Sequence, residues 1–173
     1  VLMHMKGTPQ DMQKDPVYDD VVEEICRFLA ERMETAGKAG IVREQILVDP
    51  GIGLFGKTTV HNLEILRRIG EFRELGVPVL VGPSRKRFIA DVLEIPVPRD
   101  RLAGTLAAVA ACVLGGIECI RVHDVLPARQ VPTYAPPFDH QLRKKPPMNN
   151  ATDTFTNLLS FSCFLPRRSH APE

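Results

Sequence analysis

The apolar residues of the first 125 positions alternate between short runs and helical stripes. Four runs have the length of buried strands, at positions 1–5, 45–48, 77–81 and 118–123. Between them, apolar residues recur every three or four positions, which predicts helices over 17–36, 59–75, 85–92 and 103–114. The order β-α-β-α-β-α-β predicts an α/β fold with a parallel sheet. Four such strands suit either a small doubly wound sheet or half of an eight-stranded barrel.

Polar or charged residues stand at the carboxyl end of every predicted strand. Lys6-Gly7-Thr8 follow the first strand, Asp49-Pro50-Gly51 the second and Ser84-Arg85-Lys86 the third. The loops at this end of the strands carry the active sites of (β/α) barrels, so we expect the chemistry there. Arg121 and His123 are two residues apart on the last strand and therefore point to the same side. Both side chains can carry a positive charge, so burying them together costs free energy. A bound phosphate would offset that cost.

The composition changes near Leu126. All 12 glycines precede this residue, whereas 8 of the 15 prolines follow it. Prolines at positions 127, 132, 136 and 137 are expected to prevent the helix that should follow the last strand. We therefore predict two parts, a folded unit of residues 1–125 and an irregular, Pro-rich tail of residues 126–173 that is disordered or loosely packed.

Charge and cysteine usage narrow the classes of function. The formal net charge of +1 gives no basis for binding nucleic acid or an anionic membrane. No apolar run is long enough to span a bilayer, and the first residues lack the pattern of a signal peptide. The four cysteines form no CxxC pair and stand among apolar residues. We expect buried thiols in a reducing compartment, the cytoplasm or the interior of an organelle.

One segment satisfies the pattern of a nucleotide-binding P-loop. Residues Gly51–Thr58 read GIGLFGKT, which fits G-x-x-x-x-G-K-[ST] between a predicted strand and a predicted helix. A P-loop protein also needs an acidic residue at the end of a later apolar strand to hold magnesium. The strand VPVLV ends without one, and ECIRVHD is interrupted by Arg121 and His123. The P-loop is therefore kept as an alternative.

Five segments, in order along the chain, resemble a known enzyme family. They read MHMKGTPQDMQ, ILVDPGIG, LVGPSRKRFI, AGTLAAVAA and RVHDV. Together they are similar to successive signature segments of dihydropteroate synthases, from the fifth to the eighth strand of that family's (β/α)8 TIM barrel. The resemblance implies that residues 1–125 form the C-terminal half of a pterin-binding TIM barrel, with four parallel strands and their helices.

The resemblance also implies an activity and roles for particular residues. Dihydropteroate synthases are transferases of folate biosynthesis that join dihydropterin pyrophosphate to p-aminobenzoate and release pyrophosphate. Asp49 matches the family's pterin-reading aspartate, and Met5 falls on the wall of the pterin pocket. Lys86 matches the lysine that contacts the pterin ring. Arg121 and His123 match the pair that holds the pyrophosphate and stabilises it as the leaving group.

On the p-aminobenzoate side, the resemblance places Phe55, Ser84 and Arg87. The loop that carries Phe55 is one residue longer than the family's DPGIGFGK, so either Leu54 or Phe55 is the extra residue. A neighbouring family, the methyltetrahydrofolate-binding barrel of corrinoid methyltransferases, also reads its pterin with an aspartate. The segments SRKRF and RVHDV favour the synthase.

The other half of the barrel has no counterpart in this sequence. The resemblance implies that this missing N-terminal half carries the ligand for the Mg²⁺ that the family uses. Four strands of an open barrel leave two strand edges unpaired, so the chain alone is expected to associate and to lack synthase activity. The partners that the resemblance allows are a second copy of the chain or a complementing N-terminal half. A truncated product without function is a further alternative.

Overall fold

The computed structural model describes residues 1–134 and the two-residue strand 163–164. The strands are β1 (Leu2–Met3), β2 (Val48–Asp49), β3 (Leu80–Val81), β4 (Cys119–Arg121) and β5 (Cys163–Phe164). The α-helices are α1 (Val21–Lys38), α2 (Thr59–Arg67), α3 (Arg87–Leu93), α4 (Leu102–Leu114) and α5 (Val125–Tyr134). Three 3-10 helices complete the chain, η1 (Arg43–Gln45), η2 (Ile69–Leu75) and η3 (Pro98–Asp100).

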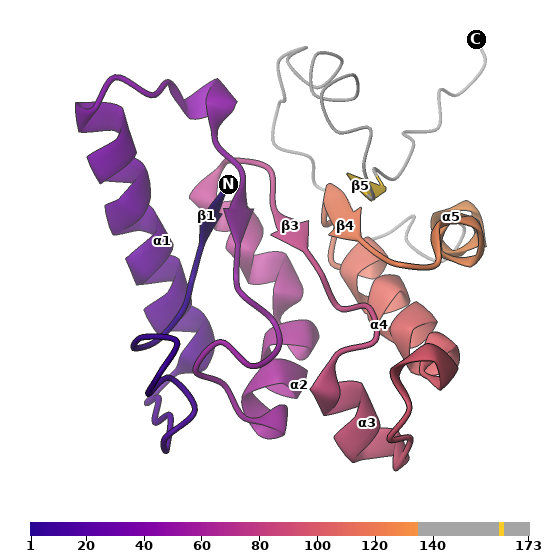
Figure 1. Cartoon of the computed structure of the whole chain (residues 1–173). Helices are drawn as coiled ribbons and strands as arrows, with labels where there is room; N and C mark the ends of the chain where they lie inside the picture. The colour runs from indigo at the N-terminus through magenta and orange to yellow at the C-terminus, as the bar shows by residue number, and fades with distance from the viewer. Residues whose placement is uncertain (135–162, 165–173) are drawn as a thin grey trace, which may run out of the picture.

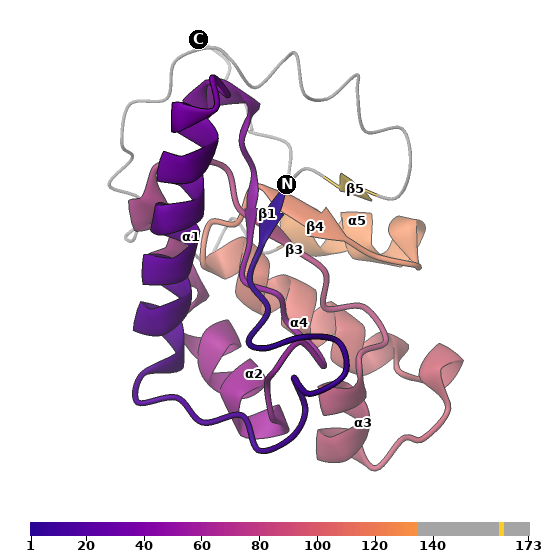
Figure 2. The ribbon, with the colours of Figure 1, turned by 60° about the vertical axis from the view of Figure 1, so that its left-hand side comes forward.

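The first four strands are parallel neighbours in chain order. β1 pairs with β2, and β3 pairs with β4. A parallel bridge between Val48 and Val79 joins the two pairs. Helices α2 and α4 lie on one side of the strands, and α1 runs beside β1 (Figures 1 and 2). The predicted α/β fold with parallel strands is therefore confirmed.

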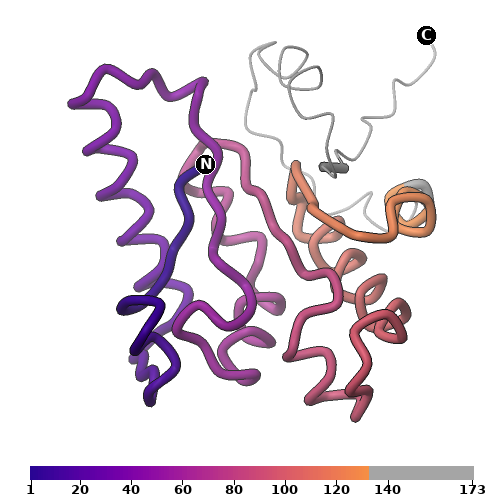
Figure 3. Tube along the Cα trace, viewed as in Figure 1, coloured from indigo at the N-terminus to yellow at the C-terminus, as the bar shows by residue number. Residues whose placement is uncertain are grey.

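Side-chain alternation gives the strands two different faces. One face packs against the helices in the main apolar core, through Val48, Val79, Val81, Ile120 and Val122. The opposite face, which we call the inner face, carries a smaller cluster of Leu47, Leu80 and Cys119. Two residues further along the same three segments come Asp49, Gly82 and Arg121, which therefore share the inner face. Figure 3 shows the loops after β1, β2 and β3 together in the lower half of the view.

Helix α1 has the boundaries that its sequence predicts to within a few residues. The Asp20 carboxylate caps its start by accepting hydrogen bonds from the backbone N–H groups of Val22 and Glu23. The predicted apolar stripe is buried in the core, and consists of Val22, Ile25, Leu29 and Met33. Helix α4 likewise follows its prediction and ends before Gly115.

Several predicted elements, including all four strands, are shorter in the structure. The helix predicted over 59–75 is interrupted at Arg68, where α2 ends and the 3-10 helix η2 continues. The strand predicted over 45–48 begins only at Val48, because Gln45 closes η1. The helical spacing of the sequence predicts both Leu63 and Ile69 on the buried side of this helix, but Leu63 is 43% exposed, whereas Ile69 is buried.

The prediction that prolines prevent a helix after the last strand is wrong. Helix α5 begins directly after β4 and its loop, and includes Pro127 and Pro132. Pro127 stands in the first turn, where a backbone N–H has no acceptor within the helix, so its missing donor costs little. Pro132 removes one internal hydrogen bond, yet Ala128 is fully buried in the core. Packing therefore outweighs the lost hydrogen bond. The remainder of the predicted tail, apart from β5, lies outside the described residues.

Strand β5 also corrects the expectation that the tail leaves the strand edges open. It pairs antiparallel with β4, with Ile120 opposite Phe164 and Arg121 opposite Cys163. One edge of the described sheet is therefore covered by a segment of the tail.

Leu29→Ala and Leu63→Ala test this description of the core with the same chemical change at two sites. Leu29 is fully buried, so its truncation should lower the free energy of unfolding by about 2–5 kcal/mol. Leu63 is largely exposed, so its truncation should cost less than about 0.5 kcal/mol. Urea unfolding monitored by circular dichroism measures both values. Equal losses would contradict the burial of Leu29 and the exposure of Leu63.

Candidate active site

Ionisable groups gather at the carboxyl end of the inner face. Asp49 ends β2, Lys86 precedes α3, and Arg121 ends β4. The structure brings these three predicted residues together, since the charges of both Lys86 and Arg121 act on the Asp49 carboxyl. His123 follows two residues after Arg121 and shares its side of the chain.

Asp49 is buried and must be stabilised as an anion by its neighbours. Burial raises the pKa of its carboxyl. The backbone N–H of Gly51, which donates to Oδ1 at 2.7 Å, lowers the pKa, as do the positive charges of Arg121, Lys86 and Lys57. The turn therefore holds one carboxylate oxygen of Asp49, and among the described residues the other oxygen has no hydrogen-bond donor.

The side chain of Lys86 packs against the loop that follows β2, at Gly53 and Phe55. Its Nζ stands 4.8 Å from the centre of the Phe55 ring, a cation–π geometry. A Cβ at Gly53 would lie 3.1 Å from this Nζ, so the absence of a side chain there leaves room for the lysine. Burial and the nearby Arg121 lower the pKa of Lys86, which Asp49 raises. Phe55 thus lies beside Lys86, whereas Leu54 is 48% exposed, and the place of Phe55 on the p-aminobenzoate side stays a prediction.

Arg121 and His123 lie beside the residues that follow β3. The Arg121 guanidinium lies over Gly82, where a Cβ would meet Nη2 at 2.8 Å. Ser84 is buried, and its Oγ accepts a hydrogen bond from the backbone N–H of His123 at 3.2 Å. The same Oγ lies 2.9 Å from Nδ1 of His123. Ser84 therefore contacts His123, one of the two residues predicted to hold the pyrophosphate.

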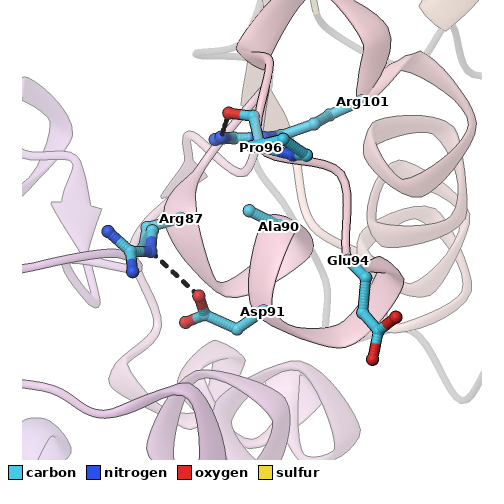
Figure 4. A pocket seen from close by; sticks show the side chains of 6 residues that line it. All are labelled: Arg87, Ala90, Asp91, Glu94, Pro96 and Arg101. Carbon is cyan, nitrogen blue, oxygen red and sulfur yellow. Dashed lines mark hydrogen bonds and ion pairs between the residues drawn. The ribbon is translucent and has the colours of Figure 1, made fainter.

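Met5 and Arg87 take different positions relative to this cluster. Met5 follows Met3 by two residues at the end of β1 and is half-buried. Arg87 is exposed, and its guanidinium pairs with Asp91 one turn along α3 at 2.9 Å. It lines an open groove with Ala90, Asp91, Glu94, Pro96 and Arg101 (Figure 4). The structure therefore does not bring Arg87 to Asp49 and Lys86, and its place beside p-aminobenzoate stays a prediction.

Lys57 contradicts the P-loop alternative. Its side chain is completely buried, and its Nζ lies 2.9 Å from Nδ1 of His4 and donates to the carbonyl of Phe55 at 3.2 Å. Burial lowers its pKa to about 7, against the opposing effect of Asp49. A P-loop lysine must reach the phosphates of a nucleotide, whereas this one is turned into the protein.

The loop of residues 50–57 is fixed by side chains from outside it. Gln13 accepts a hydrogen bond from the N–H of Gly56 at 2.8 Å, and Tyr18 donates to the carbonyl of Gly56 at 2.7 Å. Asn62 is buried and accepts from the N–H of Gly53 at 2.6 Å. No sequence pattern points to these residues, because their partners are backbone groups elsewhere along the chain.

Arg101 performs a similar role for the loop after β3. It is buried, and its guanidinium donates to the backbone carbonyls of Ile95 at 2.9 Å and Arg85 at 2.8 Å. It also donates to the carbonyl of Pro96 (Figure 4). A buried arginine that bonds only backbone carbonyls leaves no pattern in the sequence, so Arg101 was missed.

The comparisons with known proteins agree with this geometry. The sequence profile of a family described as pterin binding enzyme matches residues 1–123. This chain belongs to that family. A relative is the dihydropteroate synthase of Escherichia coli K12, which is 45% identical over 124 residues. That alignment covers 72% of this chain and 43% of the relative.

Solved structures of dihydropteroate synthases are also similar to this chain. The enzyme from Xanthomonas albilineans in complex with 7,8-dihydropteroate is 43% identical, with a TM-score of 0.68. The alignment covers 75% of this chain and 46% of that one. The same enzyme with 4-aminobenzoic acid is 45% identical, with a TM-score of 0.68 and coverages of 75% and 45%. The synthase resemblance is thus supported over the P-loop and methyltransferase alternatives.

The comparisons also show how much of each relative this chain represents. It spans about half the length of the curated and solved relatives that it matches. Within residues 1–134 and 163–164, no helix is long and apolar enough to cross a membrane. The same residues contain no group of three His, Cys, Asp or Glu side chains that could hold a metal ion.

Lys57→Met tests the buried position of Lys57. The pKa of Lys57 is about 7 in the folded chain and 10.5 when unperturbed, so between these values the unfolded chain retains a proton that the folded chain has lost. The free energy of unfolding should therefore rise with pH across this window, and the cost of burying the charge is complete below it. The variant should lack this rise.

The measurement is urea unfolding of both proteins from about pH 6 to about pH 9.5, the range over which linkage predicts the difference. The buried thiols of Cys26 and Cys112, whose pKa values are raised by burial, contribute equally to both proteins and cancel in the comparison. Parallel pH dependences would show that Lys57 keeps its ordinary pKa and is not buried as described.

Proposed function

We propose that this chain supplies the pterin and pyrophosphate sites of a dihydropteroate synthase, as the second half of a TIM barrel. The observation that carries the proposal is the buried Asp49 carboxyl group, with Lys86 acting on it from the loop after β3 and Arg121 from the end of β4. A barrel with its site at the carboxyl ends of the strands would need this arrangement. The similarity to dihydropteroate synthases supports it.

Asp49 is the pterin-reading group in this proposal. The guanidine-like edge of a pterin offers two N–H donors, and a carboxylate can accept both in a bidentate geometry. One oxygen of Asp49 already accepts from Gly51, and the free lone pairs of both oxygens are available to the ligand. Lys86 lies against the pterin ring from the Phe55 side, and Met5 closes the pocket wall.

Arg121 and His123 bind the pyrophosphate of the substrate. During the reaction the amine nitrogen of p-aminobenzoate attacks the CH₂ carbon, and the C–O bond to pyrophosphate breaks. The electron pair of that bond remains on the departing pyrophosphate, and the amine loses a proton. Cationic donors fixed around the departing group stabilise the charge that develops there, which is the main means of catalysis available to these residues.

The p-aminobenzoate ring would lie on the side of Phe55, Ser84 and Lys86. The Xanthomonas albilineans structure with 4-aminobenzoic acid supports this choice of second substrate. An aromatic ring beside Phe55 would stack on a side chain already held by Lys86. Arg87 would need to leave Asp91 to take part.

The residues described here do not suit a Mg²⁺ site. Asp49 stands among three cations, and the described residues contain no cluster of three possible ligands. Any Mg²⁺ of the reaction would be bound by the half of the barrel that this sequence does not match. We also propose that the protein partner of this chain is a polypeptide that carries the other half of the barrel, or a second copy of the chain. The reaction is proposed to take place in the cytoplasm or an organelle.

Two substitutions, compared on two ligands, test the proposed roles. Asp49→Asn replaces one acceptor with a donor. It should weaken the binding of both the dihydropterin alcohol and dihydropterin pyrophosphate by about 2 kcal/mol, the contribution of a hydrogen bond to a charged group. Arg121→Ala should weaken only the pyrophosphate ester to that extent. Isothermal titration of the chain with each ligand measures the four changes.

ATP with Mg²⁺ serves as the control ligand for the same proteins. It should not bind the parent chain, because Lys57 is buried beneath the loop. If Arg121→Ala weakens the alcohol and the pyrophosphate ester equally, Arg121 holds the fold and not the phosphate, and the assignment fails.

A further inference from the structure

The two loops that carry the proposed binding groups are cross-linked at successive positions. Ser84 contacts His123 through its Oγ, as described above. The next residue of each loop forms an ion pair, in which Arg85 donates from Nε to Asp124 Oδ2 at 3.1 Å and from Nη2 to Oδ1 at 2.7 Å. This is the two-point geometry of an arginine and a carboxylate. It fixes orientation as well as distance.

Arg85 itself is held in an unusual backbone conformation. Its φ angle is 58°, in the left-handed region that residues other than glycine seldom adopt. Three contacts hold it there, since its N–H donates to Thr105 Oγ1 at 3.0 Å, its carbonyl accepts from Arg101, and its side chain bonds Asp124. Such conformations persist where the surroundings determine them and are found at ligand sites.

The two chain neighbours of Arg85 contact different groups of the site. Ser84, on one side, faces His123, and Lys86, on the other, lies against Phe55 and the inner face. The Arg85–Asp124 pair is partly exposed, with 29% and 23% of the two side chains accessible. A pair of this kind contributes little to stability. Its consequence is therefore geometric, because it joins the loop of Lys86 to the strand end of Arg121 and His123.

We propose that Arg85 and Asp124 are positioning residues that hold Lys86 at a fixed separation from Arg121 and His123. This inference rests on the proposed function. Dihydropterin pyrophosphate would touch both groups at once, the ring at Lys86 and the phosphates at Arg121 and His123. A ligand that bridges two sites gains affinity only when their spacing matches its own. Breaking the pair should penalise the bridging ligand and spare ligands that touch one side.

The test compares three ligands by isothermal titration of the full chain. They are the dihydropterin alcohol, inorganic pyrophosphate and dihydropterin pyrophosphate. Arg85→Asn removes the ion pair and keeps a residue that tolerates a positive φ angle. Asp124→Asn removes it from the other side. Each variant should bind dihydropterin pyrophosphate at least roughly tenfold more weakly than the parent chain, because small misplacements of binding groups lower affinity on that scale. Each variant should bind the dihydropterin alcohol and inorganic pyrophosphate with an affinity within about threefold of that of the parent.

Three further proteins sharpen this comparison. The double variant should be no weaker than either single variant, because the shared interaction is already lost. Arg85→Lys, which keeps the charge but not the two-point geometry, should give an intermediate loss. Arg67→Asn is the matched control, since Arg67 makes a two-point pair with Glu64 within α2, and it should bind all three ligands as the parent does.

The outcomes separate this inference from the proposed function. Equal weakening of all three ligands, additive effects in the double variant, or unchanged binding of the bridging ligand would each overturn the positioning role. Weakening of inorganic pyrophosphate alone would also overturn it, because the pair would then act directly on the anion. A parent chain that binds neither the dihydropterin alcohol nor dihydropterin pyrophosphate would instead overturn the proposed function, and this inference with it.

Discussion

The site depends on a buried carboxyl group whose negative charge only neighbouring protein groups can stabilise. Asp49 has lost most of its contact with water, which favours the neutral acid. The N–H of Gly51 and three cations from different segments oppose this effect. These cations come from the loops after β2 and β3 and from the end of β4. Parallel pairing in chain order is what brings those ends together on one face.

Two of these basic groups are lysines, and they differ in the direction in which packing holds their side chains. Lys86 lies on the inner face beside Phe55, whereas Lys57 points into the protein toward His4. Burial of Lys57 fixes the loop that carries Phe55, since its Nζ also binds the Phe55 carbonyl. The segment that matches the P-loop pattern therefore uses its lysine to hold in place the loop that carries Phe55.

Periodicity predicted the parallel order and the faces of the strands well. Alternation alone places Arg121 and His123 on one side, and the spacing of Ile25 and Leu29 predicts α1. The sequence could not predict α5, because proline penalties are local and the burial of Ala128 depends on the tertiary fold. Arg101 was missed for a related reason. Its bonds go to backbone carbonyls, which any sequence provides.

A crystal structure of the chain with dihydropterin pyrophosphate would test the central claim most directly, because it locates both ends of the ligand. The account predicts that two N–H groups of the pterin meet the Asp49 carboxylate, and that the phosphates lie within hydrogen-bonding distance of Arg121 and His123. Phosphates bound at the loop before α2, or a pterin bound away from Asp49, would contradict it.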